Sequence, residues 1–235
     1  MGRIVAIYKP KGPTSHDIVD AVRRAAGERT VGHAGTLDPL ARGVLVIGIG
    51  RAATRRLREV AGAEKEYLAI IRLGESSATD DAEGEKRAHP PEMIPGRDAV
   101  EQALAQFVGT IEQTPPAYSA VKIRGIPAHR RMRRGEKIAL EPRAVIIKKV
   151  RILAYAWPDL RIRVITGPGV YIRALARDIG AALGTAGYLA DLERTRVGKY
   201  TSESAIPLDR IGDMLGAGSG NEAVEKDKKD KAAAH

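Results

Sequence analysis

The pattern of apolar and polar positions predicts a mixture of strands and helices along the chain. Short apolar runs that end at glycine, proline or charged residues indicate strands at 3–8, 44–50, 65–74, 144–156 and 159–166. Apolar residues that recur every three or four positions indicate helices at 15–26, 52–61, 98–108 and 170–183. The two kinds of element do not follow a strict β–α–β order. We therefore expect an α+β fold, with a mixed, mostly antiparallel central sheet and flanking helices.

Several of these elements carry local signals. Thr14 or Ser15 is expected to cap the first helix, and Gly27 to end it. The run KEYLAIIRLG at 65–74 is apolar enough to predict a strand that is buried on both faces. Only Trp157-Pro158 separates the last two strands, which predicts an antiparallel hairpin. The segments expected to be loops are the glycine-rich 31–43, the acidic 75–85 and the first part of 111–125.

Positive charge is concentrated in one part of the chain. Lys and Arg number 39 against 29 Asp and Glu, for a net charge of +10. Residues 122–151 hold eleven Lys or Arg against two Glu, a net charge of +9, and a short helix is expected at 127–134. Such a segment favours a polyanionic partner such as nucleic acid. The alternative is a helix whose charged face is simply solvated.

Several classes of protein and site are excluded by what the sequence lacks. It contains no apolar run of about 18 residues and starts without a signal peptide, so a cytoplasmic protein is expected. The absence of cysteine excludes disulfides, thiolate nucleophiles and cysteine-based zinc sites. A phosphate loop, a dinucleotide fingerprint, a serine-hydrolase elbow and a histidine pair with metal-binding spacing are also missing. We expect neither a metal nor a cofactor.

The glycine-rich loop is the strongest candidate for chemistry. Gly32, Gly35 and Gly43 allow a positive φ or the close approach of a ligand. Asp38 precedes a proline, which favours an extended conformation for the aspartate. Taken alone, an Asp-Pro pair in such a loop is usually only part of a turn, and His33 could merely hydrogen-bond within the loop.

Six motifs follow one another in a fixed order over about residues 5–208. They are KPKGPTSHDIV, GHAGTLDPLARGVL, KEYLAIIRLGESSATDD, PPAYSAVKIRG, GPGVYIRALARDIGAALG and DLERTRVGKY. In content and order they resemble the tRNA pseudouridine synthases of the TruB and dyskerin type. The resemblance implies the pseudouridine synthase fold with a basic thumb-like insertion at about 119–151. It also implies isomerisation of the T-loop uridine at position 55 of tRNA, by base flipping and an aspartate-dependent exchange of the glycosidic bond.

The resemblance assigns roles to individual residues. Asp38 matches the catalytic carboxylate, Tyr67 the tyrosine that stacks on the flipped base, and Arg173 the arginine that ion-pairs with the aspartate. The residues implied to bind the RNA are His33, Asp81, Tyr171, Leu192, Arg130, Arg131, Arg133 and Arg134. Lys9 and Pro10 match a motif that supports the active-site loop.

Each assignment has a purely structural alternative. Tyr67 and Leu192 could be ordinary core residues, Arg173 a surface residue of its helix, and Asp81 one of several solvated acids. The sequence also departs from the family pattern at a few positions, which are Arg42, Ser77-Ala78, Val170 and Glu193.

The organisation expected from this resemblance is simple. Residues 1–215 are expected to form the catalytic domain, and 216–235 a disordered, charged tail. A full C-terminal RNA-binding domain is not expected, which favours tRNA over the guide-RNA-dependent branch. The predicted partner is the T-arm stem-loop of tRNA, bound by a monomer without an obligate protein partner. The alternatives are a synthase that acts on another stem-loop, such as one in rRNA, and a non-catalytic RNA chaperone.

Overall fold

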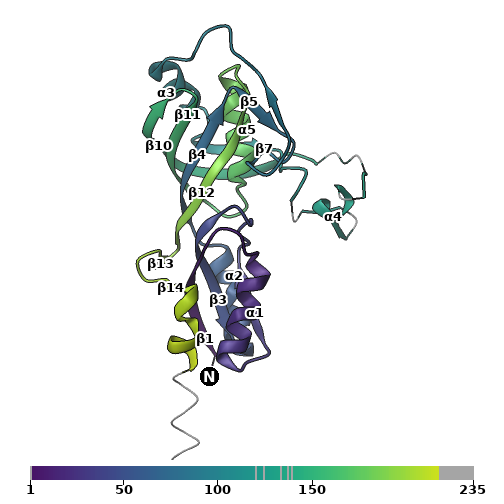
Figure 1. Cartoon of the computed structure of the whole chain (residues 1–235), viewed down its shortest axis with the longest axis vertical. Coiled ribbons are helices and arrows are strands. Elements are labelled where there is room, and N and C mark those ends of the chain that lie inside the picture. The colour runs from purple at the N-terminus through teal and green to yellow at the C-terminus, as the bar shows by residue number, and fades with distance from the viewer. Residues whose placement is uncertain are drawn as a thin grey trace, which may run out of the picture. The chain divides into compact units, whose positions relative to one another are not determined.

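The chain forms two compact units, each built from strands and helices (Figure 1). The computed structural model describes residues 2–119, 121–123, 125–132, 134–136, 138 and 140–216. Unit 1 runs up to Ala61 and resumes at Arg196, and unit 2 comprises Gly62–Thr195. The tail predicted at 216–235 lies outside the described residues, apart from Gly216.

Unit 1 is a small sheet with helices. Its strands are β1 (Arg3–Lys9), β2 (Val31–Ala34), β3 (Arg42–Ile49), β13 (Tyr200–Thr201) and β14 (Ile206–Pro207). β3 pairs antiparallel with both β1 and β2, and β14 pairs parallel with β1. Its helices are α1 (Ser15–Ala26), α2 (Arg51–Ala61), the 3-10 turn η1 (Leu208–Arg210) and α6 (Ile211–Gly216).

The strand β3 is buried on both faces because helices cover both sides of it. Leu45 and Ile47 pack with Ile18 of α1, whereas Val46, on the other face, packs with Leu57 of α2. Successive side chains of a strand point to opposite faces, so a strand covered on both sides requires an unbroken apolar run. This explains why the sequence VLVIGI contains no polar residue.

The predicted start and end of the first helix are confirmed. Thr14 caps α1 by accepting a hydrogen bond from the backbone N–H of Asp17, and the Asp17 carboxylate in turn accepts one from the N–H of Thr14. This reciprocal capping box satisfies two donors that the helix itself cannot. Gly27 ends the helix with a φ of +60°, a conformation that glycine adopts without strain.

Two segments that the sequence predicts as loops contain strands. The glycine-rich segment begins with β2, in which Gly32 is the register partner of Gly48 on β3. A side chain on Gly48 would lie 3.1 Å from the Leu57 Cγ, so the glycine allows α2 to pack closely on the sheet. The acidic segment begins with β5 (Glu75–Ser77), which pairs antiparallel with β6 (Lys86–Ala88) directly after the segment. Long-range pairing therefore overrides the loop-like composition of both segments.

Unit 2 is a larger antiparallel sheet. In spatial order its strands are β12 (Gly187–Val197), β4 (Lys65–Leu73), β11 (Asp159–Thr166), β10 (Arg143–Ala156) and β7 (Gly109–Gln113). Its helices are α3 (Arg97–Ala105), α4 (Ala128–Met132) and α5 (Ile172–Ala182), and a small hairpin joins β8 (Lys122–Ile123) to β9 (Ile126–Pro127). The predicted hairpin of β10 and β11 is confirmed.

The strand β4 is buried on one face only, so the predicted two-sided burial is wrong. Tyr67, Ala69 and Ile71 are buried, whereas Leu68 and Ile70 between them are partly exposed. The helices α3 and α5 contact each other and lie against β10 and β4, respectively, which places both on the same side of the sheet. An apolar run alone does not reveal which face a helix will cover.

The sequence pattern missed two strands of this sheet, β7 and β12. The segment of β7 was expected to be a loop, and β12 mixes buried residues irregularly with partly exposed ones over eleven positions. Both strands depend on neighbours that are distant in sequence, so their local composition is a weak signal. The α+β class and the mixed, mostly antiparallel sheet are nevertheless confirmed.

The helix α5 packs directly against the start of β12 because a glycine removes the side chain between them. A Cβ on Gly180 would lie 2.2 Å from the carbonyl carbon of Ala186 and 2.3 Å from the nitrogen of Gly187. No side chain fits at that distance without moving the backbone. This contact fixes the position of the helix that carries Arg173.

We expect Gly180→Ala to lower the free energy of unfolding by about 1–3 kcal/mol or more, because the new methyl group overpacks the contact with β12. Urea denaturation of the full chain measures this change. Gly212→Ala is the matched control, because a Cβ there would meet nothing within 4 Å. Equal urea midpoints for the two variants would show that α5 does not depend on this close approach.

Candidate functional site

The loop that carries Asp38 is held on both sides of the aspartate by buried side chains of unit 1. The Ser15 hydroxyl donates to the Leu37 carbonyl and accepts from the Leu37 N–H, both at 2.9 Å. On the other side, the Lys9 ammonium donates to the Pro39 carbonyl at 3.3 Å. Asp38 itself is half-buried between these two anchored neighbours. Rigid placement of this kind is what a catalytic carboxylate requires.

The Lys9 side chain links the turn that follows β1 to the loop that carries Asp38. Its side chain is fully buried and also donates to the carbonyls of Pro10 at 2.9 Å and Pro13 at 2.8 Å. A buried ammonium is costly unless it is hydrogen-bonded, and these carbonyls supply that compensation. The Gly12 N–H adds a further hydrogen bond to the Pro39 carbonyl at 2.9 Å. The contacts fit the support that the resemblance implies for Lys9 and Pro10.

His33 lies on β2, at the start of the same segment. Its ring meets the ring of His16 on α1 edge to face, with the ring centroids 5.7 Å apart. The ring is therefore packed against α1 and is part of the surroundings of the loop. Its role toward RNA stays a prediction.

Arg173 and Asp81 form a buried ion pair in unit 2. The Arg173 Nη1 lies 3.3 Å from the Asp81 Oδ2, and the two side chains are only 7% and 4% exposed. The guanidinium also donates to the carbonyls of Thr79 at 3.2 Å and Tyr118 at 2.8 Å. The Asp81 carboxylate further accepts from the Glu83 N–H at 3.0 Å. Arg173 is thus not a surface residue of its helix, and Asp81 is not a solvated acid.

Tyr67 and Leu192 are both 6% exposed, on β4 and β12. This burial suits a core residue and the lining of a base pocket equally well, so their roles toward the base stay predictions. Tyr171 is the N-cap residue of α5, two positions before Arg173. Asp38 belongs to unit 1, whereas Tyr67 and Arg173 belong to unit 2, and their joint action remains a prediction as well.

The predicted basic insertion begins with the β8–β9 hairpin and the short helix α4 in unit 2. Arg131 pairs with Glu136 at 2.6 Å, and Arg134 is exposed. Arg133 and the side chain of Arg130 lie outside the described part of the chain. The short helix expected in this segment is confirmed, although it covers only Ala128–Met132.

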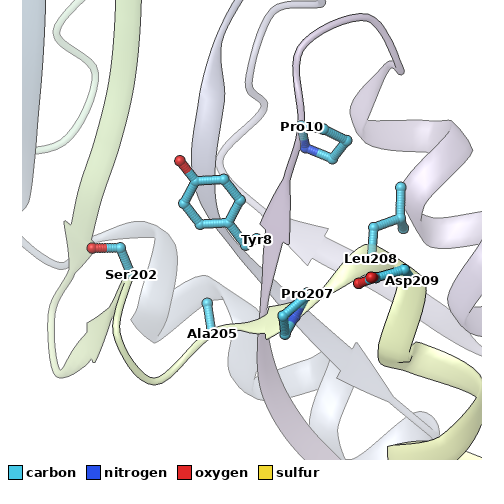
Figure 2. A pocket seen from close by; sticks show the side chains of 7 residues that line it. All are labelled: Tyr8, Pro10, Ser202, Ala205, Pro207, Leu208 and Asp209. Atoms are coloured by element: carbon cyan, nitrogen blue, oxygen red, sulfur yellow. The ribbon is translucent and has the colours of Figure 1, made fainter.

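A separate pocket of about 610 Å³ lies in unit 1. Its lining comes from the end of β1 and from the chain between β13 and α6 (Figure 2). The lining residues are Tyr8, Pro10, Ser202, Ala205, Pro207, Leu208 and Asp209. None of them was predicted to be catalytic, although Pro10 belongs to the motif assigned to support the Asp38 loop.

Two buried cations in unit 2 were missed by the sequence analysis. Lys65 precedes Tyr67 by two positions on β4, and Arg194 follows Leu192 by two positions on β12. They are 6% and 1% exposed, and the Lys65 ammonium donates to the Ala63 carbonyl at 2.8 Å. In a strand, residues two apart share a face, so each cation lies on the same face as the neighbouring predicted site residue. The spacing of two residues from Tyr67 and from Leu192 was the signal by which the sequence could have revealed these two cations.

Within the described residues, no three His, Asp or Glu side chains lie close enough together to hold a metal ion. Nor is any helix in that part of the chain long and apolar enough to cross a membrane.

Lys65 should make stability depend on pH. Burial, and to a smaller extent the charge of Arg194, lowers the pKa of Lys65 to about 8, whereas an unfolded lysine has a pKa of about 10.4. Between these values the unfolded chain binds more protons than the folded one, so the penalty that the buried ammonium imposes on folding is relieved as pH rises. We expect the urea midpoint of the wild type, relative to that of Lys65→Met, to rise between about pH 7 and about pH 9.5.

Lys149→Met serves as the control for this titration, because Lys149 is exposed. Its midpoint should keep a constant difference from that of the wild type over the same pH range. If Lys65→Met also kept a constant difference, Lys65 would titrate as an ordinary lysine.

Comparison with known proteins places this chain in a family. Residues 23–172 match the description "TruB family pseudouridylate synthase (N terminal domain)", and residues 173–225 match "tRNA pseudouridylate synthase B C-terminal domain". The tRNA pseudouridine synthase B of Thermobifida fusca is 49% identical over 216 residues, which cover 88% of this chain and 73% of the relative. That of Leifsonia xyli subsp. xyli is 49% identical over 212 residues, which cover 87% and 70%.

A solved structure shares the fold. The crystal structure of a Cbf5-Nop10-Gar1 complex contains a chain that matches with a TM-score of 0.70 and 29% identity. The match covers 89% of this chain and 53% of that chain. The motif order, the fold and the family matches agree, and the chain belongs to the TruB family of pseudouridylate synthases.

Proposed function

We propose that this chain is a tRNA pseudouridine synthase that converts the T-loop uridine at position 55 into pseudouridine. The observation that carries the proposal is the Asp38 loop, which has the family's sequence and is anchored on both sides of the aspartate by Ser15 and Lys9. Anchoring of this kind presents a carboxylate in one fixed position, as covalent or proton-transfer chemistry requires.

The reaction moves the glycosidic bond from N1 to C5 of uracil. The C1′–N1 bond breaks with its electron pair on the base, the freed uracil rotates, and a C1′–C5 bond forms. The C5 hydrogen then leaves as a proton and N1 acquires one, so the product is an isomer of the substrate. No oxidant, reductant or metal is needed for this balance.

Asp38 can assist in one of two ways, and both need it ionised. As a nucleophile, it bonds to C1′ while N1 leaves, and C5 later displaces it. As a base, it removes the 2′ proton to give a glycal, and it later returns that proton. The resemblance implies that Arg173 pairs with this carboxylate, which would oppose the rise in pKa that burial causes. In unit 2 the buried Arg173 guanidinium is held by Asp81, and its pairing with Asp38 is part of the proposal.

The target uridine has to leave its stacked loop before Asp38 can reach C1′. Base flipping costs a few kcal/mol, and stacking on an aromatic ring restores about 1–3 kcal/mol. We assign that stacking to Tyr67 and the apolar wall of the base pocket to Leu192. The basic insertion would bind the phosphates of the T-arm and supply much of the affinity. We propose that the enzyme acts as a monomer in the cytoplasm and needs no cofactor.

Asp38→Asn should abolish isomerisation, with a loss of more than about 10³-fold, because the amide can act neither as nucleophile nor as base. Release of tritium from a tRNA transcript labelled at C5 of uridine measures turnover, and carbodiimide mapping locates the product. Binding should change by only a few-fold, since phosphate contacts dominate affinity. The control Asp213→Asn, at an exposed position on α6, should retain wild-type turnover.

Three results would contradict this proposal. A wild-type protein that binds tRNA without releasing tritium would favour the non-catalytic RNA chaperone instead. Product at a uridine of rRNA alone would favour the other stem-loop substrate. Clear turnover by pure Asp38→Asn would remove Asp38 from either chemical role.

Replacing Arg130, Arg131, Arg133 and Arg134 together with Gln should weaken tRNA binding and flatten its salt dependence. Each lost phosphate contact lowers the slope of log K against log salt by roughly 0.7–0.9. Filter binding at several salt concentrations measures the slope. An unchanged slope would mean that the basic insertion is a solvated surface only.

A further inference from the structure

Arg177 repeats, one turn along α5, the bonding pattern of Arg173. The two arginines are four positions apart, so their side chains leave the same face of the helix. Each reaches the turn between β5 and β6, here called the acid turn (residues 79–83), and the segment that begins with the last residue of β7, here called the strap (residues 113–118). Arg173 does so through Asp81 and the Tyr118 carbonyl.

Arg177 makes its own bridge between the acid turn and the strap. Its Nη1 donates to the Asp80 Oδ2 at 2.9 Å, and its Nη2 donates to the Thr114 carbonyl at 2.8 Å. Its Nε donates to the Asp178 Oδ1 at 2.9 Å, which orients the guanidinium from within the helix. The planar fork of an arginine can serve three acceptors at once in this way, whereas an ammonium has no fixed plane.

The backbone of the acid turn depends on Asp80. This residue has a φ of +59°, an unusual value for a residue other than glycine, and its carbonyl accepts from the Leu189 N–H of β12 at 3.0 Å. Its side chain is only 17% exposed. Burial raises the pKa of Asp80, and Arg177 is the main group that opposes the rise. The ion pair thus holds a strained turn in place directly beside Asp81.

The strap is fastened to α5 at its other points as well. The Gln113 side chain accepts from the Tyr171 N–H at 2.9 Å and donates to the Tyr171 carbonyl at 3.2 Å. Gln113 is 1% exposed, so this pair is a fixed buried contact. Gln113, Arg177 and Arg173 therefore bind the strap at its start, at Thr114 and at Tyr118, immediately before the basic insertion.

We propose that Arg177 is a positioning residue for the isomerisation. It ties the acid turn and the strap to α5, and so fixes Asp81 and the Tyr118 carbonyl where they orient the Arg173 guanidinium. The inference rests on the proposed function for the catalytic role of Arg173. The contacts of Arg177 with Asp80 and with the Thr114 carbonyl, here called the clamp, lie within unit 2 and do not depend on that role.

An exposed salt bridge elsewhere in unit 2 provides a matched control. Arg72 pairs with Asp159 at the same 2.9 Å, but these side chains are 38% and 46% exposed and bridge no loops to a helix. Exposed pairs of this kind contribute little to stability. Arg72→Gln thus removes an arginine of the same unit without touching the clamp.

The experiment compares Arg177→Gln, Arg177→Lys, Asp80→Asn and the double variant Arg177→Gln/Asp80→Asn with Arg72→Gln, all in the full chain. We expect Arg177→Gln to lower the single-turnover rate on tRNA at least about tenfold, because small misplacements of catalytic groups are costly. The tRNA Kd should stay within about threefold, since phosphate contacts dominate affinity. Asp80→Asn keeps a residue that tolerates positive φ, and the double variant should be no slower than the slower single variant.

Arg177→Lys should recover part of the rate, because it restores the charge beside Asp80 without the fork. Hydrogen–deuterium exchange in the free protein should rise in the acid turn and the strap for Arg177→Gln and Asp80→Asn, and stay at the wild-type level for Arg72→Gln. This exchange does not depend on any reaction.

The possible results separate the two proposals. Wild-type turnover in Arg177→Gln, a loss confined to the Kd, or an equal loss in Arg72→Gln would each overturn the positioning role. Strictly additive losses in the double variant would show that Arg177 does not act through Asp80, which also overturns it. An inactive wild-type protein would overturn the proposed function, and the exchange measurement would then decide whether the clamp exists.

Discussion

Buried cations bound to backbone carbonyls organise the irregular segments of both units. In unit 1 the fully buried Lys9 joins the carbonyls of its own turn to Pro39, beside Asp38. In unit 2 Arg173 joins the carbonyls of Thr79 and Tyr118 to the Asp81 carboxylate. A buried charge is costly unless every donor finds an acceptor, so each cation forces the surrounding loops into one arrangement. The loops that carry the proposed chemistry are therefore rigid without being regular.

The regular elements supply the fixed points to which these loops attach. α1 begins at a capping box and ends at Gly27, and it presents Ser15 to the residue before Asp38. α5 is held close to β12 by the missing side chain of Gly180, and it presents its two arginines to the acid turn and the strap. Helices and strands bury most of the apolar surface and carry the stability. The polar network around the loops can therefore serve mainly to hold the proposed functional side chains in place.

The proposed enzyme combines this rigidity with a strongly basic insertion. Unstacking one base costs a few kcal/mol, and phosphate contacts made elsewhere on the RNA are the natural source of that free energy. The strap joins the two functions physically, because it runs from β7 along α5 and ends immediately before the insertion. The Arg173 guanidinium, which the strap holds through the Tyr118 carbonyl, is thereby linked to the basic insertion that would bind the RNA.

The sequence by itself determined the strands and helices with a clear apolar period, the cap of α1, and the identity of Asp38 and Arg173 as site candidates. These depend on local spacing or on contiguous motifs. It did not reveal β2 or β12, because these strands depend on pairing partners that are distant in sequence. Nor did it reveal the one-sided burial of β4, which depends on which face a distant helix covers. Nor did it indicate that Arg177 bridges Asp80 to Thr114, 97 and 63 positions away. Only the tertiary structure brings such partners together, since no local pattern relates residues that lie so far apart in the chain.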